Sequence, residues 1–254
     1  MDCRFHPAMR RVKEILESKE LGGIKNISVR MILPRFFGDD DIRFNYALGG
    51  GAMMDLGCQF YFRKRRMKID VELGYALNCI QYLSSSTEAS VTGVTHEPFV
   101  PHPEPADYVK NVDRRTEAKI ELANGVTASL ACDLGAPPTW GYIPKFPQIR
   151  LGVDCELGSI DMFNFVMPTL YHSISVKIRG GHTRVEKVYG SKSKGEEWWT
   201  TYRFQLETFV DRLRGRKTDG WLTKEESVVV MEWIEKVYNE GGMGSRPKSS
   251  YIMS

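Results

Sequence analysis

The segment Gly49-Gly50-Gly51-Ala52-Met53-Met54-Asp55 combines a run of glycines with one carboxylate in an apolar helical pattern. Glycine has no Cβ, so such a junction lets the backbone approach another group closely. Asp55 lies one turn inside the predicted helix, where an acidic residue among apolar ones is uncommon. Two explanations stay open: Asp55 interacts with the positive end of the helix dipole, or it is a functional carboxylate that points into a substrate pocket.

The histidines and cysteines do not add a metal site to this candidate. The five histidines lack His-x-x-x-His spacing, and the five cysteines are scattered without a Cys-x-x-Cys pair. The pattern therefore predicts no metal ligands and no disulfide framework, and it favours a reducing, cytoplasmic compartment.

The net charge of +3 is confined to one short segment, residues 59–74, which holds five basic and two acidic residues. The rest of the chain is neutral. A nucleic-acid-binding surface usually spreads basic residues over a face of the fold, so we expect no nucleic-acid partner. No apolar run reaches the roughly 18 residues that a membrane crossing needs, and the first residues form no signal peptide, so we expect no membrane association.

The elements that must position Asp55 are predicted from periodicity. Residues 24–33 alternate as a strand, and Asn124-Gly125 joins two further strands in a hairpin. Strands are predicted over 24–33, 91–96, 115–122, 126–133, 149–153, 159–162, 173–178 and 183–188, and helices after Pro7, near residue 51, and over 75–83, 200–214 and 223–239. This arrangement is α+β: a large, open, mainly antiparallel sheet with helices packed on one face. No Gly-x-Gly-x-x-Gly occurs, so a dinucleotide-binding fold is not expected within these residues.

An ordered set of motifs runs through residues 4–250. It comprises Arg4-Phe5-His6-Pro7, Glu20-Leu21-Gly22-Gly23-Ile24, the glycine segment through Asp55-Leu56-Gly57-Cys58, Glu156-Leu157-Gly158-Ser159-Ile160, and Thr201-Tyr202-Arg203-Phe204-Gln205-Leu206-Glu207. The set resembles the C-terminal domain of the glucose-fructose oxidoreductase, inositol dehydrogenase and MocA family. Within that family it looks closest to the D-xylose dehydrogenase and dimeric dihydrodiol dehydrogenase branch.

The resemblance implies a two-domain enzyme that transfers hydride between NADP or NAD and the hydroxyl-bearing carbon of a D-xylose-like sugar or trans-dihydrodiol. An N-terminal Rossmann domain would bind the cofactor, and the sheet domain, which we assign to residues 1–254, would form one wall of the substrate pocket and a homodimer interface. That Rossmann domain and its Glu-Lys-Pro lysine are missing from this sequence. We therefore expect no dehydrogenase activity from this chain alone. A non-catalytic sugar-binding or dimerisation module is the alternative.

The resemblance also implies site residues, and one of them is displaced. Family members place a Tyr or His four residues after the Asp of the glycine helix, but that position is Gln59 here. Removal of residues 59–74 brings Tyr75 to that place, one helical turn after Asp55. We therefore interpret residues 59–74 as an insert, a translated intron, with an ordinary surface loop or a basic binding patch as the alternatives. Asp55 and Tyr75 are the predicted catalytic residues. Arg43 and Tyr46, just before the glycines, either bind substrate or are a loop arginine and a packing tyrosine.

Overall fold

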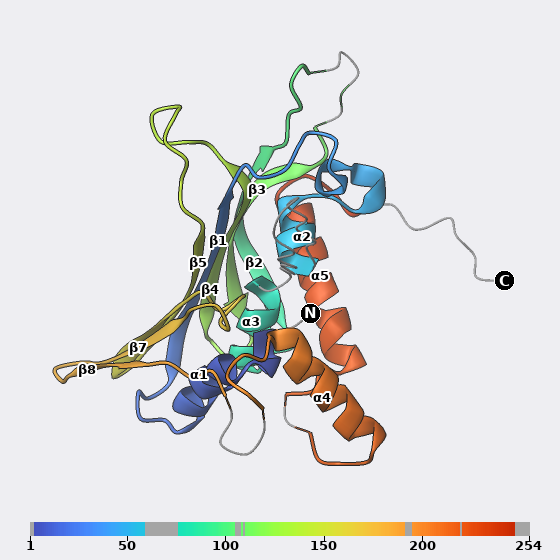
Figure 1. The fold of residues 1–254 in the computed structure, drawn as a ribbon. Helices are drawn as coiled ribbons and strands as arrows, with labels where there is room; N and C mark the ends of the chain where they lie inside the picture. The colour runs from blue at the N-terminus through green and yellow to red at the C-terminus, as the bar shows by residue number, and fades with distance from the viewer. Residues whose placement is uncertain are drawn as a thin grey trace.

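A computed structural model describes residues 3–58, 76–104, 108, 110–190, 195–218 and 220–246. Its centre is an open eight-stranded sheet in the order β2-β3-β4-β1-β5-β6-β7-β8 (Figure 1). The strands are β1 (Ile24–Pro34), β2 (Ala89–Pro98), β3 (Asp113–Leu122), β4 (Thr127–Ala136), β5 (Gln148–Cys155), β6 (Gly158–Phe163), β7 (Ser173–Ile178) and β8 (Thr183–Glu186). Neighbours pair antiparallel, except that β1 and β4 run parallel. The predicted α+β class and mainly antiparallel sheet are confirmed.

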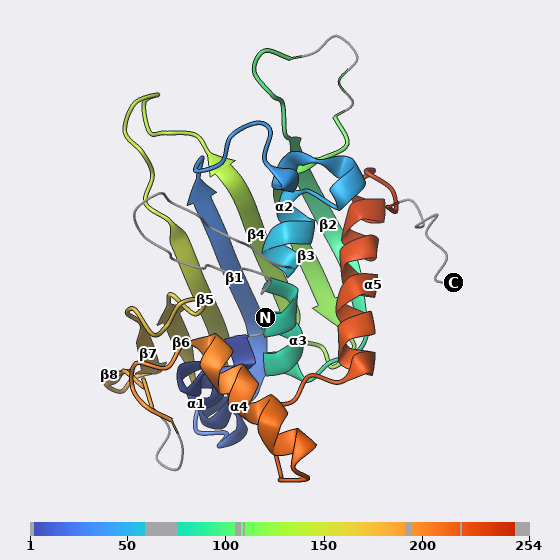
Figure 2. The same ribbon diagram turned by 45° about the vertical axis from the view of Figure 1, so that its right-hand side comes forward.

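The helices lie on one face of this sheet, as predicted (Figures 1 and 2). In both views α2 and α3 follow one another along one line over the sheet, with α5 beside them. The helices are α1 (Pro7–Glu17), α2 (Ala52–Cys58), α3 (Ala76–Ser84), α4 (Thr201–Leu213) and α5 (Lys224–Glu240), with short 3-10 turns η1 (Cys3–Phe5), η2 (Ile42–Phe44) and η3 (Tyr46–Leu48).

Side-chain alternation explains why the central strand has one buried face. Ile27, Val29 and Met31 of β1 are at most 1% exposed, because they point into the layer between sheet and helices. The side chains between them are polar and face the other side. Asn124 and Gly125 form the predicted turn between β3 and β4, where Gly125 has a φ of 78°.

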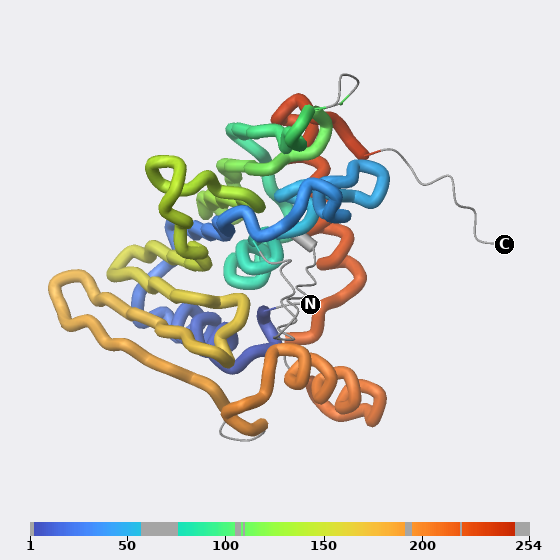
Figure 3. The backbone as a smooth tube through the Cα atoms, turned by 45° about the horizontal axis from the view of Figure 1, so that its top comes forward, coloured from blue at the N-terminus to red at the C-terminus, as the bar shows by residue number. Residues whose placement is uncertain are grey.

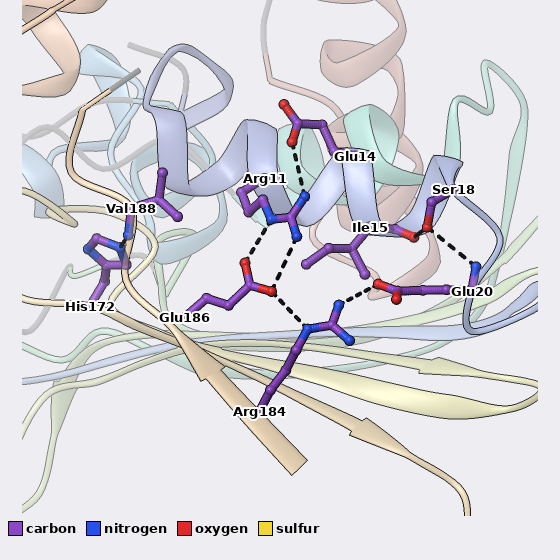
Figure 4. Close-up of polar contacts among 9 residues, drawn as sticks. All are labelled: Arg11, Glu14, Ile15, Ser18, Glu20, His172, Arg184, Glu186 and Val188. Carbon is purple, nitrogen blue, oxygen red and sulfur yellow. Dashed lines mark hydrogen bonds and ion pairs between the residues drawn. The ribbon is translucent and has the colours of Figure 1, made fainter. Parts of the chain in front are cut away.

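The edge of the sheet at β8 is tied to α1 by ion pairs (Figure 4). Arg11 of α1 donates to Glu186 of β8 through Nε at 2.7 Å and through Nη2 at 3.3 Å. Arg184 donates to the same carboxylate and to Glu20. In the tube drawing α1 lies beside the β7–β8 hairpin (Figure 3). These contacts hold the last hairpin against the first helix.

The apolar residues at helical spacing in 200–214 predict a stripe that packs in the core, and for most of α4 this prediction is wrong. Leu206, Phe209 and Leu213 are 49%, 46% and 72% exposed. Only the first half of α4 reaches the core, where Phe204 packs against Trp199 and His6. α5 enters the core through Val230, Trp233, Ile234 and Val237, but Val228 and Met231 of its predicted stripe are 47% and 45% exposed.

Candidate functional site

The glycines before α2 are needed by the packing of the chain on itself. Gly49 and Gly51 have φ values of 79° and 130°, which residues with a side chain rarely adopt. A Cβ on Gly50 would lie 2.5 Å from the Arg43 carbonyl oxygen, and a Cβ on Gly51 would lie 2.3 Å from Asp113 Oδ1. The close approach expected at this junction is therefore to neighbouring protein atoms. It brings η2, η3 and the start of α2 into one tight cluster.

Asp55 and Arg43, two of the predicted site residues, meet beside this cluster. Asp55 Oδ2 lies 3.2 Å from Arg43 Nε, and their side chains are 10% and 6% exposed. Among the described residues, Asp55 Oδ2 accepts no hydrogen bond of good geometry. The ion pair is therefore close but poorly directed, which leaves the carboxylate only partly compensated for its burial.

Arg43 is held in place mainly by other groups. Its Nη1 donates to both oxygens of Asp41, at 2.9 and 3.1 Å, and its guanidinium carbon lies 4.4 Å from the centre of the Phe37 ring. Asp41 also caps η2 by accepting from the Arg43 backbone N–H. Arg43 is thus a buried structural cation of this cluster, and it presents only its Nε edge to Asp55.

The burial of Asp55 changes its acidity. Loss of water raises the pKa of Asp55 to about 8, and the negative charges of Asp41 and Asp113 act in the same direction. The charge of Arg43 opposes this shift but does not cancel it. Near neutral pH the carboxyl therefore keeps its proton in most molecules and can donate a hydrogen bond as well as accept one.

A second group of residues anchors the start of α2 from the side of the sheet. Asp113, fully buried at the start of β3, accepts from the Met53 backbone N–H at 2.8 Å. It also accepts from the hydroxyl of Tyr238 on α5 at 2.9 Å. The Tyr238 hydroxyl in turn accepts from the Met54 backbone N–H at 3.2 Å. Burial raises the pKa of Tyr238, and the Asp113 charge adds to the effect, so the hydroxyl remains protonated.

This anchor satisfies helix N–H groups that no residue nearby in the sequence satisfies. Asp113 and Tyr238 were missed as parts of the site, because they lie about 60 and 184 positions away from the helix they bind. Tyr238 belongs to a segment, Val237-Tyr238, that also supports the family resemblance, but no local motif assigns either residue to the site.

Tyr46 lies apart from the ion pair. The guanidinium carbon of Arg246 is 4.2 Å from the centre of the Tyr46 ring, and Arg246 Nη2 donates to the Gly50 carbonyl at 2.6 Å. Tyr46 is half-buried in this stack. The structure therefore brings Arg43 to Asp55 and places Tyr46 against Arg246.

Tyr75, the other predicted catalytic residue, lies outside the described residues, as do residues 59–74 of the interpreted insert. α2 ends at Cys58 and α3 begins at Ala76. Within the described ranges, no group of His, Cys, Asp and Glu could hold a metal ion. No helix in that part of the chain is long and apolar enough to cross a membrane.

Comparison with known proteins gives one significant relative by sequence. No family model matches the chain. The chain is 25% identical over 242 residues to D-xylose 1-dehydrogenase (NADP(+)) 2 of Haloferax volcanii. The aligned region covers 95% of this chain and 61% of that enzyme.

Solved structures share the fold. Aldose-aldose oxidoreductase from Caulobacter crescentus, complexed with glycerol, matches with a TM-score of 0.68 at 14% identity, over 94% of this chain and 60% of that one. A 3-ketoreductase from Actinomadura kijaniata, in complex with NADP and TDP-benzene, matches with a TM-score of 0.64 at 17% identity, over 94% of this chain and 61% of that one. The chain spans about three fifths of the length of the relatives it matches.

Proposed function

We propose that this chain is the substrate-side domain of an NAD(P)-dependent sugar oxidoreductase. The reason is its homology to the C-terminal region of such enzymes in the glucose-fructose oxidoreductase, inositol dehydrogenase and MocA family. The reaction is oxidation of a D-xylose-like sugar or trans-dihydrodiol hydroxyl by hydride transfer to NADP or NAD in the cytoplasm. The observation that carries the site assignment is the buried pair of Asp55 and Arg43 at the glycine-to-helix junction.

The described residues do not fit a dinucleotide site of their own. Such a site needs a parallel strand, a glycine-rich turn and a helix whose N-terminus faces the phosphates. Here the glycine turn leads into α2, but the N–H groups of Met53 and Met54 are already taken by Asp113 and Tyr238. We therefore expect a domain outside these residues to hold the cofactor, and we expect no dehydrogenase activity from the chain alone.

Within the proposed enzyme, this chain supplies proton chemistry at the substrate hydroxyl. Asp55, protonated near neutral pH, orients the hydroxyl or the phenol of Tyr75 by hydrogen bonding. Tyr75 transfers the proton. Arg43 holds Asp55 through their ion pair, and Tyr46 binds the substrate beside the glycines.

The role of Tyr75 depends on the insert. α2 and α3 follow one line in Figures 1 and 2, which supports one helix that residues 59–74 interrupt. Removal of these residues places Tyr75 one turn after Asp55 on the same helix face. Sequencing the native transcript through the Tyr75 codon tests this proposal. A message that joins Cys58 directly to Tyr75 and encodes a Rossmann domain upstream supports it; a message that retains the 16 codons contradicts the intron interpretation.

A measurement on the protein tests the activity. The purified 254-residue chain is expected to show no NADP-dependent oxidation of D-xylose, while the enzyme translated from a longer transcript oxidises it. Turnover by the 254-residue chain would contradict the assignment of the cofactor site to another domain.

One observation favours the alternative of a dimerisation module. Helices cover one face of the sheet and leave the other open (Figure 1). At the centre of the open face, Ser28 of β1 lies in register with Ser129 of β4 and Gly152 of β5. Such small side chains let a second sheet approach closely. We propose that two copies of the chain pair through this face.

A further inference from the structure

Cys3 and Cys79 are 76 positions apart in the sequence, but their sulfur atoms lie 2.9 Å apart in the core. Cys3 belongs to η1 and Cys79 to α3, and the two residues are 1% and 0% exposed. The two sulfur atoms of a disulfide lie about 2.05 Å apart, so these two would have to approach one another by about 1 Å for the bond to form. The scattered cysteines gave no sign of this pair in the sequence.

Contacts beside the sulfur atoms fix η1 on α3. Arg4, the neighbour of Cys3, donates through Nη2 to Gln81 Oε1 at 3.3 Å. The guanidinium carbon of Arg4 also lies 4.9 Å from the centre of the Tyr82 ring. Arg4 Nη1 is 3.2 Å from Glu226 of α5. The two thiols are therefore held together by a packed interface that does not depend on them.

We propose that Cys3 and Cys79 are a modification site, a dithiol that a small peroxide oxidises to a disulfide between η1 and α3. One thiol loses its proton, its thiolate attacks an oxygen of hydrogen peroxide, the O–O bond breaks, and the leaving hydroxide takes up that proton, so that a sulfenic acid and one water result. The second thiol then attacks the sulfenic sulfur, the S–S bond forms, and a second water leaves. The two sulfur atoms lose two electrons, and the peroxide takes them up.

Two further cysteines, Cys132 and Cys155, are held mainly as neutral thiols. Burial raises the pKa of Cys155 to about 11, and it raises the pKa of Cys132 as well, with the charges of Asp113 and Asp133 adding to the shift. The thiolate is the reactive form, so both stay unreactive near neutral pH. Both are free thiols.

The cross-link would close a loop that contains the candidate site. Arg43 and Asp55 lie between Cys3 and Cys79 in the chain. Closure of so long a loop restricts the unfolded chain, so the oxidised protein is expected to unfold at a higher urea concentration than the reduced one. This effect is independent of any catalytic role of the site.

The test compares the chain after treatment with hydrogen peroxide and after dithiothreitol. Maleimide labelling in denaturant should find five thiols in the reduced chain and three after peroxide. Trypsin should release residues 1–4 linked to residues 69–110, and the urea midpoint should rise. Dithiothreitol should reverse all three changes.

Two serine variants sharpen the result. Cys79→Ser should lose the cross-link and the shift in midpoint, whereas Cys155→Ser should keep both. Five free thiols after peroxide, a link to another cysteine, or sulfinic acid at Cys3 or Cys79 without a link would each overturn the proposal. The peptide map of the native chain decides the question even where Cys79→Ser does not fold.

Discussion

Asp55 should make the folded chain less stable as the pH rises through neutrality. Its pKa is raised to about 8 in the fold, while an aspartate in an unfolded chain titrates near pH 3.9. Between these values the folded state binds more protons than the unfolded state. The free energy of unfolding therefore decreases with rising pH across this window, and the full contribution is present only below about pH 4.

The magnitude follows from the two pKa values. Between pH 6.5 and pH 8.5, proton linkage at Asp55 should lower the free energy of unfolding by about 2 kcal/mol. The buried histidines act in the opposite direction, because burial lowers the pKa of His6 to about 3 and lowers the pKa of His96 and His172. Their destabilising effect begins at the lower end of this window, near pH 6.5, and offsets part of the Asp55 slope, so the Asp55 contribution has to be taken as a difference between the native chain and a variant that keeps the histidines.

Urea unfolding followed by tryptophan fluorescence at pH 6.5, 7.5 and 8.5 measures this slope. Between pH 6.5 and pH 8.5 the free energy of unfolding of Asp55→Asn should fall by about 2 kcal/mol less than that of the native chain, because the variant has no carboxyl to titrate. Subtracting the slope of Asp55→Asn from the slope of the native chain removes the contributions of the buried thiols and histidines, which both proteins share. Asp40→Asn, an exposed carboxylate on the preceding loop, is the matched control and should follow the native chain. A slope in Asp55→Asn equal to the native one would refute the argument that burial outweighs Arg43.

Three further substitutions test the surroundings of the site and the sheet. Gly51→Ala should destabilise the fold by about 3 kcal/mol in urea unfolding, because its φ of 130° and the nearby Asp113 oxygen exclude a Cβ; a loss below 1 kcal/mol would contradict this packing. Thr223→Ala should lower stability by about 1 kcal/mol, because it removes the capping box with Glu226 at the start of α5, while Thr92→Ala on the exposed side of β2 serves as its control. Ser28→Trp should shift the chain from dimer to monomer in sedimentation velocity without loss of helix content; an unchanged monomeric mass in both proteins would exclude pairing through the open face.

Local patterns predict the elements better than they predict the site. Alternation at Ile27, Val29 and Met31 marks β1, and Asn124-Gly125 marks the β3–β4 hairpin, because each signal lies within a few residues of the structure it determines. The parallel pairing of β1 with β4 has no such signal, since about 100 residues separate the two strands. Asp113 and Tyr238 could not be predicted for the same reason, since they are far in sequence from α2 and bind it only where β3 and α5 meet its first residues.

The candidate site was predicted in part. The glycines and Asp55 stand out by residue type, and the structure places Arg43 beside Asp55. The binding of the Arg43 guanidinium by Asp41 and Phe37 depends on the turn at η2, which the sequence does not reveal. The roles of Asp55, Arg43, Tyr46 and Tyr75 in a reaction stay predictions.

The position of β1 in the middle of the sheet has a consequence for how the chain folds during synthesis. β1 leaves the ribosome well before its two neighbours, β4 and β5, which begin only at residues 127 and 148. Until then its backbone N–H and C=O groups have no strand to pair with, and both edges are open to other chains. Contacts over such separations slow folding. The nascent chain therefore passes through a long interval in which its most central strand is exposed, and chaperone binding during that interval would protect it from aggregation.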